Sequence, residues 1–397
     1  MHIAIATLGP LTGDGVSRVV ESWARMLAAS DIETTVISEK PRDGAALPPI
    51  PGARHAPYEL AEDASGFGSF LELIARAGET CAELSSQGRV DLIISHHSLI
   101  SRAIRRHLPS APLLQTFHSP MVDEGRLNNW RYASTVRRIS YPARAVGFWT
   151  ADAMALRKIS CAHTLSEYTW DLLGKRYPRL CRRVPWKPIP GSVDTARFGP
   201  APDRALVRTS LGLDPDALIL LTVRRLVPRN GVDRILRCAA RAGGEGKIRF
   251  LIGGTGPLRR SLDERIAAEG LSDRVELLGF VPEETLPDYY RAADAFLLPT
   301  RELECFGLPL VEAMSCDCTP LVTPTGGPSE ICRNYPEYVA RANSTEAFAE
   351  LVERFVSGSI PRRIEDLAPD TRRRYSEEAI RPEVVRLVEQ LARQERT

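Results

Sequence analysis

The sequence lacks an excess of charge of either sign. Its 52 lysine and arginine residues face 50 aspartate and glutamate residues, which leaves a formal net charge of +2. A dedicated nucleic-acid-binding protein usually carries a clear basic excess, so this class is excluded. No stretch approaches the roughly 18 consecutive apolar residues that a membrane-spanning helix needs. The N-terminal residues MHIAIATLGPLTGDG also lack the basic and small-residue segments of a signal peptide. We therefore expect a cytoplasmic protein.

Cysteine pairs with metal-ligand spacing are missing as well. The eight cysteines are scattered without a Cys-x2-Cys pair, and Cys316 and Cys318 lack the second pair that a zinc site needs. In a long chain without an export signal, such cysteines are expected to be reduced thiols, most of them buried.

The sequence does contain a regular alternation of short apolar runs and amphipathic helical stretches. The apolar runs include HIAIATL, VDLIIS and PLLQTF in the first half, and ALILLTV, IRFLIGG and AFLLPT in the second. Alternating strands and helices indicate βαβ units, which form parallel sheets. At about 150 residues per domain, the chain has room for two to three domains. We predict an α/β protein with two Rossmann-like, doubly wound domains.

A segment rich in proline and glycine, VPWKPIPGSVDTARFGPAPDR, separates the two halves and is the best candidate for a linker. We predict an N-terminal domain of residues 1–195 and a C-terminal domain of residues 196–375. Residues 376–397 read as a charged amphipathic helix, for which a return to the N-terminal domain stays open. Open α/β sheets bind ligands beyond the carboxyl ends of their strands, so the expected site is a cleft between the domains.

A glycine-containing loop follows an early strand in each half. Gly13 and Gly15 precede the first helix, and Gly253, Gly254 and Gly256 follow the strand IRFLI. Glycines let a backbone approach a ligand closely, and a helix start offers free N–H groups to an anion. A tight turn is the alternative explanation for each loop alone.

The strongest local signal is the segment TRELECFGLPLVEAM at residues 300–314. A strand ends, a short loop holds Glu302 and Glu304, and a helix that carries Glu312 starts near Gly307. The unpaired N–H groups of a helix start suit a phosphate, whereas carboxylates accept hydrogen bonds from sugar hydroxyls. The combination predicts a nucleotide-sugar pocket. A solvated acidic loop is the alternative.

Together, these motifs resemble glycosyltransferase family 4, the retaining enzymes of the GT-B fold. LLTVRRLVPRNGVDRIL resembles the family's Gly-Arg-Leu and Lys-Gly segment, and VELLGFVPEETLPDYYRAADAFLLPTRELECFGLPLVEAM resembles its signature. The signature ends in Glu-x7-Glu, here Glu304 and Glu312, and GGPSEI resembles the Gly-Gly-x-x-Glu turn that follows. In the first half, DGVSRVV resembles the family's Gly-Gly loop, TFHS carries a histidine at a strand end, and IPGSVDTARF resembles the interdomain linker. The match covers most of the chain and is weakest at residues 120–160. It implies a GT-B fold, two Rossmann-like domains facing across a cleft.

The resemblance implies a role for each matching residue of the signature. Glu312 is expected to bind the ribose hydroxyls of the donor nucleotide, and Glu304 the hydroxyls of the donor sugar. The N–H groups of Phe306, Gly307 and Leu308 are expected to hold the distal phosphate.

It also implies roles for residues outside the signature. Arg225 is expected to pair with the diphosphate as it leaves, and the backbone near Val281 to read the base. Gly15 is expected to let the first loop close over the diphosphate. His118 is expected to lie beside the donor sugar and the reacting centre.

Some positions depart from the family pattern. Asn230 stands where the family has a diphosphate-binding lysine, and Arg224, in place of a glycine, or Arg229 is expected to supply the missing charge, since arginine binds phosphate through a bidentate fork. Asp14 and Asp317 replace two further glycines, which affects the donor affinity expected of the site.

The histidines indicate catalysis without a metal. Taken alone, His118 reads as a structural histidine, but its place at the end of a strand favours the active site. His96 and His97 are adjacent, so both cannot face one cleft from a strand, and His96 could approach the acceptor. No histidine pair has metal-ligand spacing with carboxylates, and no Asp-x-Asp lies in a metal-binding context. We expect no cofactor and no required metal, the nucleotide diphosphate sugar being a co-substrate.

The predicted reaction moves a sugar from a nucleotide diphosphate sugar to a hydroxyl of an acceptor, with retention of configuration. UDP-sugars such as UDP-GlcNAc or UDP-glucose are favoured because they are the commonest donors in the family, and GDP- and dTDP-sugars stay open. The expected acceptor is a small natural-product or cyclitol core. A lipid-linked or cell-envelope polysaccharide acceptor is the main alternative.

Residues 125–160 combine basic and aromatic side chains. Such a segment fits either an ordinary helix with a solvated basic face or a weak peripheral contact with the inner membrane face. The basic residues are Arg126, Arg131, Arg137, Arg138, Arg144, Arg157 and Lys158 against the single acid Asp152, and the aromatic residues are Trp130, Tyr132, Tyr141, Phe148 and Trp149.

Two other classes of protein share parts of this pattern. A nicotinamide-dependent dehydrogenase also has a Rossmann fold, but it needs a complete Gly-x-Gly-x-x-Gly, which Arg18 interrupts here. A catalytically silent nucleotide-sugar-binding protein is compatible with Asn230 and Asp317.

Overall fold

The computed structural model describes residues 1–41, 46–59, 66–88, 90–127, 135–243 and 247–394, with the backbone alone for residues 66, 67, 135–143 and 394. The chain divides into two compact units. The N-terminal unit comprises Met1–Ser192 together with Glu377–Thr397, and the C-terminal unit comprises Val193–Ser376. The sequence placed the corresponding boundaries at 195/196 and 375/376.

The N-terminal unit is built on a seven-stranded sheet in the order β3-β2-β1-β4-β5-β6-β7. All neighbouring strands are parallel, as expected of a doubly wound sheet. The strands are β1 (His2–Ala6), β2 (Glu33–Ile37), β3 (Ala53–His55), β4 (Leu92–Ser95), β5 (Leu113–Phe117), β6 (Cys161–Thr164) and β7 (Trp186–Pro188).

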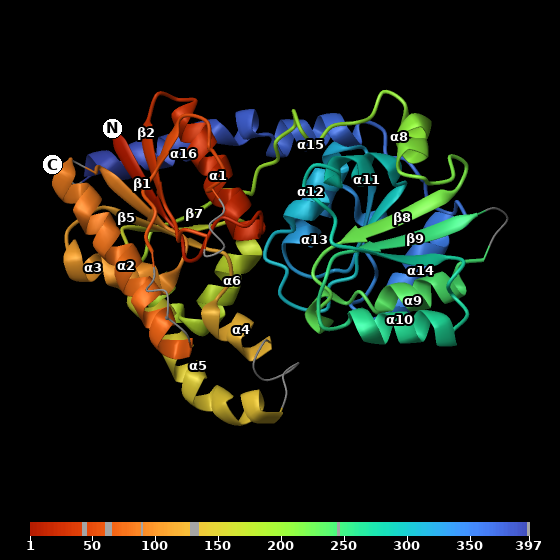
Figure 1. The fold of residues 1–397 in the computed structure, drawn as a ribbon, viewed down its shortest axis with the longest axis horizontal. Helices are drawn as coiled ribbons and strands as arrows, with labels where there is room; N and C mark the ends of the chain where they lie inside the picture. The colour runs from red at the N-terminus through yellow and green to blue at the C-terminus, as the bar shows by residue number, and fades with distance from the viewer. Residues whose placement is uncertain (42–45, 60–65, 89, 128–134, 244–246, 395–397) are drawn as a thin grey trace. The chain divides into compact units, whose positions relative to one another are not determined.

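Helices pack on this sheet because its central strands are buried on both faces and need cover. One group contains α2, α3, α4 and α5, of which α2 packs against α3 and α4 against α5, and α16 packs along α1 in Figure 1. The helices are α1 (Gly15–Ala28), α2 (Gly66–Gln87), α3 (Ser98–His107), α4 (Met121–Arg126), α5 (Thr135–Leu156), α6 (Glu167–Arg176), α7 (Pro178–Cys181) and α16 (Glu377–Gln394).

The C-terminal unit repeats the architecture with five parallel strands in the order β10-β9-β8-β11-β12. The strands are β8 (Leu218–Val223), β9 (Ile248–Gly253), β10 (Val275–Gly279), β11 (Ala295–Leu298) and β12 (Thr319–Val322). Figure 1 shows α9 and α10 on one face of this sheet and α11 and α12 on the other. The helices are α8 (Arg204–Ser210), α9 (Arg234–Arg241), α10 (Arg259–Ala268), α11 (Leu286–Ala292), α12 (Leu308–Ser315), α13 (Gly327–Ile331), α14 (Thr345–Val356) and α15 (Leu367–Tyr375), with 3-10 turns η2 (Pro228–Asn230), η3 (Cys332–Asn334) and η4 (Pro336–Tyr338).

The prediction of two doubly wound α/β domains is confirmed, but two strands were missed. Strand β3 is only three residues long, and β7 lies inside the segment that we interpreted as an irregular linker. Both are edge strands of the seven-stranded sheet. Pro188 fits at the edge because a proline cannot donate to a second neighbouring strand.

All eight cysteines are free thiols, and seven of them are buried. Only Cys305 is partly exposed. Burial raises the pKa of the Cys161 and Cys181 thiols to about 11, so neither is a thiolate at neutral pH.

Candidate active site

The first candidate site lies at the carboxyl edge of the five-stranded sheet. Strands β8 and β11 are parallel neighbours, so the loops that follow them meet at the same edge. The loop after β8 carries Arg224, Arg225 and Asn230, and the loop after β11 carries Glu304. The sheet therefore brings together residues that are 80 positions apart in the sequence.

The two adjacent arginines after β8 have different environments. Arg225 is exposed, and no described residue pairs with its guanidinium. Arg224 points inward, where its side chain is only 9% exposed and its Nη2 lies 2.5 Å from Glu304 Oε2. Burial lowers the pKa of Arg224, and the charge of Glu304 opposes that shift. Arg224 is thus committed to a buried ion pair, whereas Arg225 is available to an anion.

Asn230 lies between the two arginines. Its Oδ1 accepts a hydrogen bond from Arg224 Nη2 at 3.2 Å, and its Nδ2 donates to the Arg225 carbonyl at 2.8 Å. Arg224 Nη1 also donates to Thr300 Oγ1 at 2.7 Å. The positive charge beside position 230 therefore comes from Arg224. Arg229 instead donates to the carbonyl of Leu303 at 3.0 Å.

The start of α12 offers free backbone donors. Gly307 caps this helix with φ of 105°, a conformation that favours glycine, and Leu308 is the first helical residue. Within the part of the chain that the structure describes, the N–H groups of Phe306, Gly307 and Leu308 have no acceptor. A Cβ on Gly327 would lie 2.6 Å from Phe306 Cα, so the loop is held by tight packing. These donors are fixed in place before any anion arrives.

Glu312 and Val281 have packed surroundings. Glu312 lies in α12, is 4% exposed, and accepts a hydrogen bond from the Tyr290 hydroxyl at 3.2 Å. Val281 follows β10, and a Cβ on Gly253 would come within 2.8 Å of its side chain. This contact places Val281 beside the end of β9.

Backbone packing explains the glycines after β9. A Cβ on Gly254 would lie 2.0 Å from the Arg224 carbonyl oxygen, and one on Gly256 would lie 2.5 Å from that of Leu226. Leu226 N–H in turn donates to the Thr255 carbonyl at 2.8 Å. The loop after β9 therefore needs its glycines because its backbone packs directly against the loop that carries Arg224 and Arg225. This packing explains the glycines without a bound ligand.

The aspartates that replace family glycines have local roles. Asp14 is the N-cap of α1 and accepts from the Ser17 N–H at 2.8 Å, and a Cβ on the neighbouring Gly15 would meet nothing within 4 Å. Asp317 follows the last turn of α12 with φ of 63°, at the end opposite the free N–H groups, and pairs with Arg363. The ion pair with Arg363 therefore gives Asp317 a structural role that does not involve phosphate.

Histidines gather at the carboxyl edge of the seven-stranded sheet. His96 follows β4 and His118 follows the neighbouring β5, and His96 Nδ1 lies 2.9 Å from His118 Nε2. His97 caps α3 and accepts from the Leu99 N–H at 3.3 Å. Burial lowers the pKa of His118 to about 3 and that of His97 to about 4. These imidazoles are neutral at physiological pH.

A buried carboxylate that the sequence did not single out contacts the segment that follows His118. Asp152 of α5 is fully buried and accepts hydrogen bonds from the Ser98 hydroxyl at 2.7 Å, the Met121 N–H at 2.8 Å and the Tyr177 hydroxyl at 3.2 Å. Burial raises its pKa to about 7. Asp152 thus ties four segments together beneath the His118 loop, and it does not face the basic surface with which we grouped it.

The basic and aromatic segment is only partly within the described residues. Trp130, Arg131 and Tyr132 lie outside them, as do the side chains of Arg137, Arg138 and Tyr141. Arg126 and Phe148 are partly buried. The exposed side chains of α5 and the turn after it are Arg144, Val146, Trp149, Met154, Arg157 and Lys158.

None of the helices within the described ranges is long and apolar enough to cross a membrane. The same ranges hold no group of three or more histidine, cysteine or acidic side chains placed to bind a metal ion.

Comparison with known proteins decides the family. The family described as "Glycosyltransferase Family 4" matches residues 13–197, and that described as "Glycosyl transferases group 1" matches residues 203–381. A D-inositol 3-phosphate glycosyltransferase from Thermobispora bispora is 30% identical over 342 residues, which cover 80% of this chain and 76% of the relative. The chain belongs to glycosyltransferase family 4.

Further similar proteins agree with this assignment. A 2-deoxystreptamine glucosyltransferase from Streptomyces kanamyceticus is 27% identical to this glycosyltransferase over 298 residues, 72% of this chain and 74% of the relative. Sucrose-phosphate synthase from Thermosynechococcus elongatus has the same fold, with a TM-score of 0.82, 20% identity and 98% of both chains covered. The Anabaena protein HepE, solved with UDP-glucose, has a TM-score of 0.74 at 16% identity and covers 98% of this chain and all of its own. The GT-B fold is confirmed.

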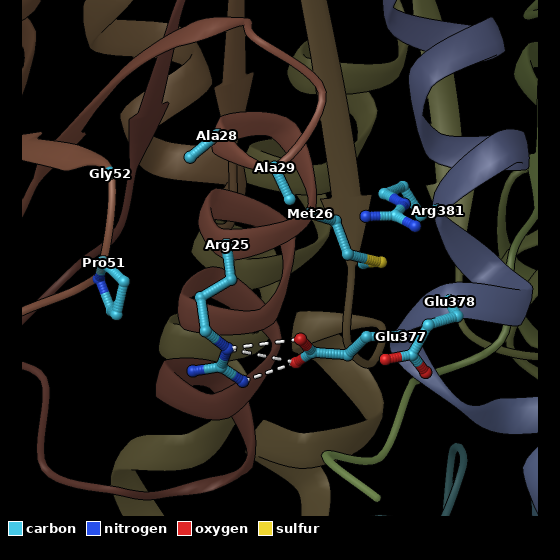
Figure 2. Close-up of a pocket in the computed structure, with 9 residues that line it drawn as sticks. All are labelled: Arg25, Met26, Ala28, Ala29, Pro51, Gly52, Glu377, Glu378 and Arg381. Carbon is cyan, nitrogen blue, oxygen red and sulfur yellow. Dashed lines mark hydrogen bonds and ion pairs between the residues drawn. The ribbon is translucent and has the colours of Figure 1, made fainter. Parts of the chain in front are cut away.

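A pocket of this glycosyltransferase lies away from the two sheet edges that hold the candidate residues. It has a volume of about 430 Å³ and is lined by the last turns of α1, by Pro51 and Gly52, and by the first turns of α16. Figure 2 shows that Arg25 and Glu377 point toward each other across it and form an ion pair of 2.5 Å. The pocket adjoins the amino end of β3, at the sheet edge opposite His118.

Proposed function

We propose that this glycosyltransferase moves a hexosyl group from a UDP-sugar to a hydroxyl of a small cyclitol or natural-product acceptor, with retention of configuration. One observation carries the proposal. At the carboxyl edge of the five-stranded sheet, the exposed Arg225 shares an edge with three N–H groups at the start of α12, and none of these groups has a partner among the described residues. Unpaired donors and an uncommitted cation together suit a diphosphate.

The chemistry follows from where charge develops. As the bond between the anomeric carbon and the diphosphate oxygen breaks, negative charge grows on the diphosphate, and Arg225 with the N–H groups of Phe306, Gly307 and Leu308 stabilises it. The acceptor oxygen forms its bond to the anomeric carbon on the face that the diphosphate leaves. The departing phosphate oxygen takes the proton of the acceptor hydroxyl. This front-face route needs no protein nucleophile.

The roles of the two carboxylates are part of the proposal. Glu304 accepts hydrogen bonds from the donor sugar, and its ion pair with Arg224 orients the carboxylate. Glu312 accepts from the ribose, and the backbone at Val281 reads the base. Gly15 leaves room for the diphosphate at the first loop.

We also propose that turnover requires no metal ion. Arg225 and the helix start supply the electrostatic stabilisation for which other transferases use a divalent cation. Activity that survives excess EDTA unchanged supports this. Activity that EDTA abolishes and Mg²⁺ or Mn²⁺ restores would contradict it.

The acceptor class is supported by the names of similar proteins. D-inositol 3-phosphate and 2-deoxystreptamine are both cyclohexane polyols, and proteins named for them resemble this chain over most of its length. The donor is supported by HepE, whose fold is shared and which was solved with UDP-glucose. UDP-GlcNAc and UDP-glucose are accordingly the first donors to test.

A lipid-linked acceptor is the second candidate. Exposed Val146, Trp149 and Met154 share α5 with exposed Arg144, a combination that suits an anionic membrane surface. Flotation with anionic liposomes at low and high salt separates the candidates. Salt-sensitive flotation that the double variant Val146→Ser/Trp149→Ser loses favours the lipid-linked acceptor, and no flotation favours the small one.

Thermal-shift measurement with UDP-, GDP- and dTDP-sugars tests the whole proposal, followed by release of free nucleotide with candidate acceptors. We expect UDP-sugars to raise the melting temperature, and inositol phosphates or aminocyclitols to trigger release of UDP. Stabilisation without turnover on any acceptor would favour the silent binding protein. Stabilisation by nicotinamide cofactors alone would overturn the proposal.

A further inference from the structure

His96 and His118 form a hydrogen-bonded pair at the ends of two neighbouring strands. Their contact joins His96 Nδ1 to His118 Nε2 at 2.9 Å, and the rings lie edge to edge, with centroids 5.2 Å apart and planes 29° apart. His96 is 4% exposed, so no large movement of its ring is open to it. The side chain of His96 therefore meets the one histidine that we place at the reacting centre.

The pair holds one proton in the contact. Burial lowers the pKa of both imidazoles, and each ring lies near other titratable groups: His163 of β6 lowers both pKa values, while Asp14 and His97 act on His118 in opposite directions. Both rings are consequently neutral at physiological pH, and a neutral imidazole carries its proton on one nitrogen only. One of the two rings must donate and the other accept.

His163 shows what a satisfied buried histidine looks like in the same sheet. Its Nε2 donates to the Ile189 carbonyl at 2.9 Å, and its Nδ1 accepts from the Thr116 hydroxyl at 3.0 Å. Both of its nitrogens are paired, and its tautomer is fixed by a carbonyl that can only accept. It needs no ligand.

His96 differs because its second nitrogen has no partner. Its Nε2 is buried and meets no donor or acceptor among the described residues. A proton on Nε2 would leave an unpaired N–H donor in the interior, and such orphaned donors are rare in native structures. The proton therefore belongs on His96 Nδ1, where it is shared with His118 Nε2.

We propose that His96 is a positioning residue that donates its Nδ1 proton to His118 Nε2 and thereby makes His118 a hydrogen-bond donor through Nδ1–H. The tautomer follows from the contacts of the two rings, whereas its effect on the substrate rests on the proposed function. A His118 that offers N–H binds an oxygen of the substrate and does not remove a proton from it. This agrees with a route in which the departing phosphate takes the acceptor's proton.

The tautomer of His118 tests the proposal directly. The chain has seven histidines, so the ring nitrogens in ¹⁵N-histidine-labelled protein are assigned by substituting them one at a time. At neutral pH we expect His118 to be protonated on Nδ1 and unprotonated on Nε2. Protonation of His118 on Nε2 would overturn the proposal.

Matched substitutions of His96 connect the tautomer to turnover. In His96→Asn, the amide nitrogen takes the place of Nδ1 and still donates, so we expect the tautomer of His118 and kcat to be kept within about threefold. In His96→Leu the donor is gone, so we expect mixed tautomers and a kcat about tenfold lower, the loss of roughly one hydrogen bond, with little change in the donor KM. The exposed His107→Asn serves as a control and should change neither.

The two failures are distinguishable. If no nucleotide sugar binds, the proposed function fails, but the NMR measurement on the free protein still reads the tautomer. If His96→Leu folds and leaves both the His118 tautomer and kcat unchanged, His96 does not position His118. If His96→Leu fails to fold, the tautomer in the wild-type protein and in His96→Asn decides alone.

Discussion

At the scale of single residues, the adjacent Arg224 and Arg225 have different environments and different proposed roles. Arg225 is exposed and has no partner in the described part of the chain, while Arg224 is buried against Glu304. The sequence predicted that Arg225 pairs with the leaving diphosphate and that Arg224 or Arg229 supplies the charge missing at Asn230. The sheet topology explains why the loop that carries these residues approaches the loop after β11. The partners of Arg224 could not be foreseen, because which of two adjacent side chains turns inward depends on the packing of a loop that has no repeat period.

Replacement of Arg225 by alanine should lower kcat/KM on the order of 100- to 1,000-fold, as loss of one transition-state donor does in other enzymes. Arg225→Lys should recover part of this, since it restores the charge without the fork. Steady-state kinetics with a cognate donor and acceptor provide the measurement. Arg260→Ala removes an arginine whose side chain is 91% exposed and should have no effect; an equal loss there would show that the effect is not specific.

Moving the buried charge from position 224 to position 230 gives a second prediction. Arg224→Gly removes the partner of Glu304, and Asn230→Lys places a second cation where Arg224 Nη2 now lies 3.2 Å from Asn230 Oδ1. We expect each single variant to lose at least tenfold in kcat/KM, because an unpaired or crowded buried charge is costly. The double variant Arg224→Gly/Asn230→Lys should be better than either single variant. A double variant that is no more active than Arg224→Gly would show that the two positions do not exchange one charge.

At the scale of secondary-structure elements, Asp152 links α5 to the segments around His118, and its titration predicts a pH dependence. Its pKa is raised from 3.8 to about 7, so the folded state binds a proton that the unfolded state releases, and this stabilisation is lost as pH rises from about 4 through 7. The linkage amounts to roughly 1.4 kcal/mol per unit of pKa difference. Asp152→Asn has no such titration.

Urea denaturation of wild type and Asp152→Asn from pH 5 to pH 8 measures this. From pH 5 to pH 8, we expect the unfolding free energy of the wild type to fall by about 3 kcal/mol relative to that of Asp152→Asn. The buried histidines act with the opposite sign, since their lowered pKa values cost stability as pH falls below 6.5. They are present in both proteins and cancel in the difference. A constant difference across the range would mean that Asp152 does not titrate in the folded protein.

The central elements were predictable from sequence, and the edge elements were not. Strands such as β1, β4 and β8 are buried on both faces, so their apolar runs are uninterrupted. Strand β7, with a lysine between a tryptophan and a proline, has no such run and pairs on one side only. The signature loop before α12 was recognised because its glycine and glutamates are fixed by local geometry, whereas the contact of His96 with His118 depends on the pairing of β4 with β5.

At the scale of the whole molecule, α16 belongs to the unit that begins the chain. Its apolar side chains Ile380, Val384, Leu387, Val388 and Leu391 are buried. Arg25 of α1 pairs with Glu377 at its start, with side chains 30% and 19% exposed.

Truncation before Glu377 should therefore unfold the N-terminal unit, because each of these side chains contributes about 1.5–3 kcal/mol when buried. Arg25→Ala removes only a partly exposed ion pair and should cost at most about 1 kcal/mol. Circular dichroism and size-exclusion chromatography of both variants check this. A truncated protein that melts like the wild type would show that α16 is dispensable.

The path of the chain between its units has a wider consequence. Val193 N–H donates to the Tyr375 carbonyl at 2.8 Å, and Val193 forms a β-bridge with Ser376, so the residues where the chain enters and leaves the C-terminal unit are neighbours. In topological terms, that unit is an insert with adjoining ends inside a host that is otherwise complete. Such an insert should be exchangeable for that of a relative without rerouting the host, and we expect the part of donor preference that we propose for its residues to move with it.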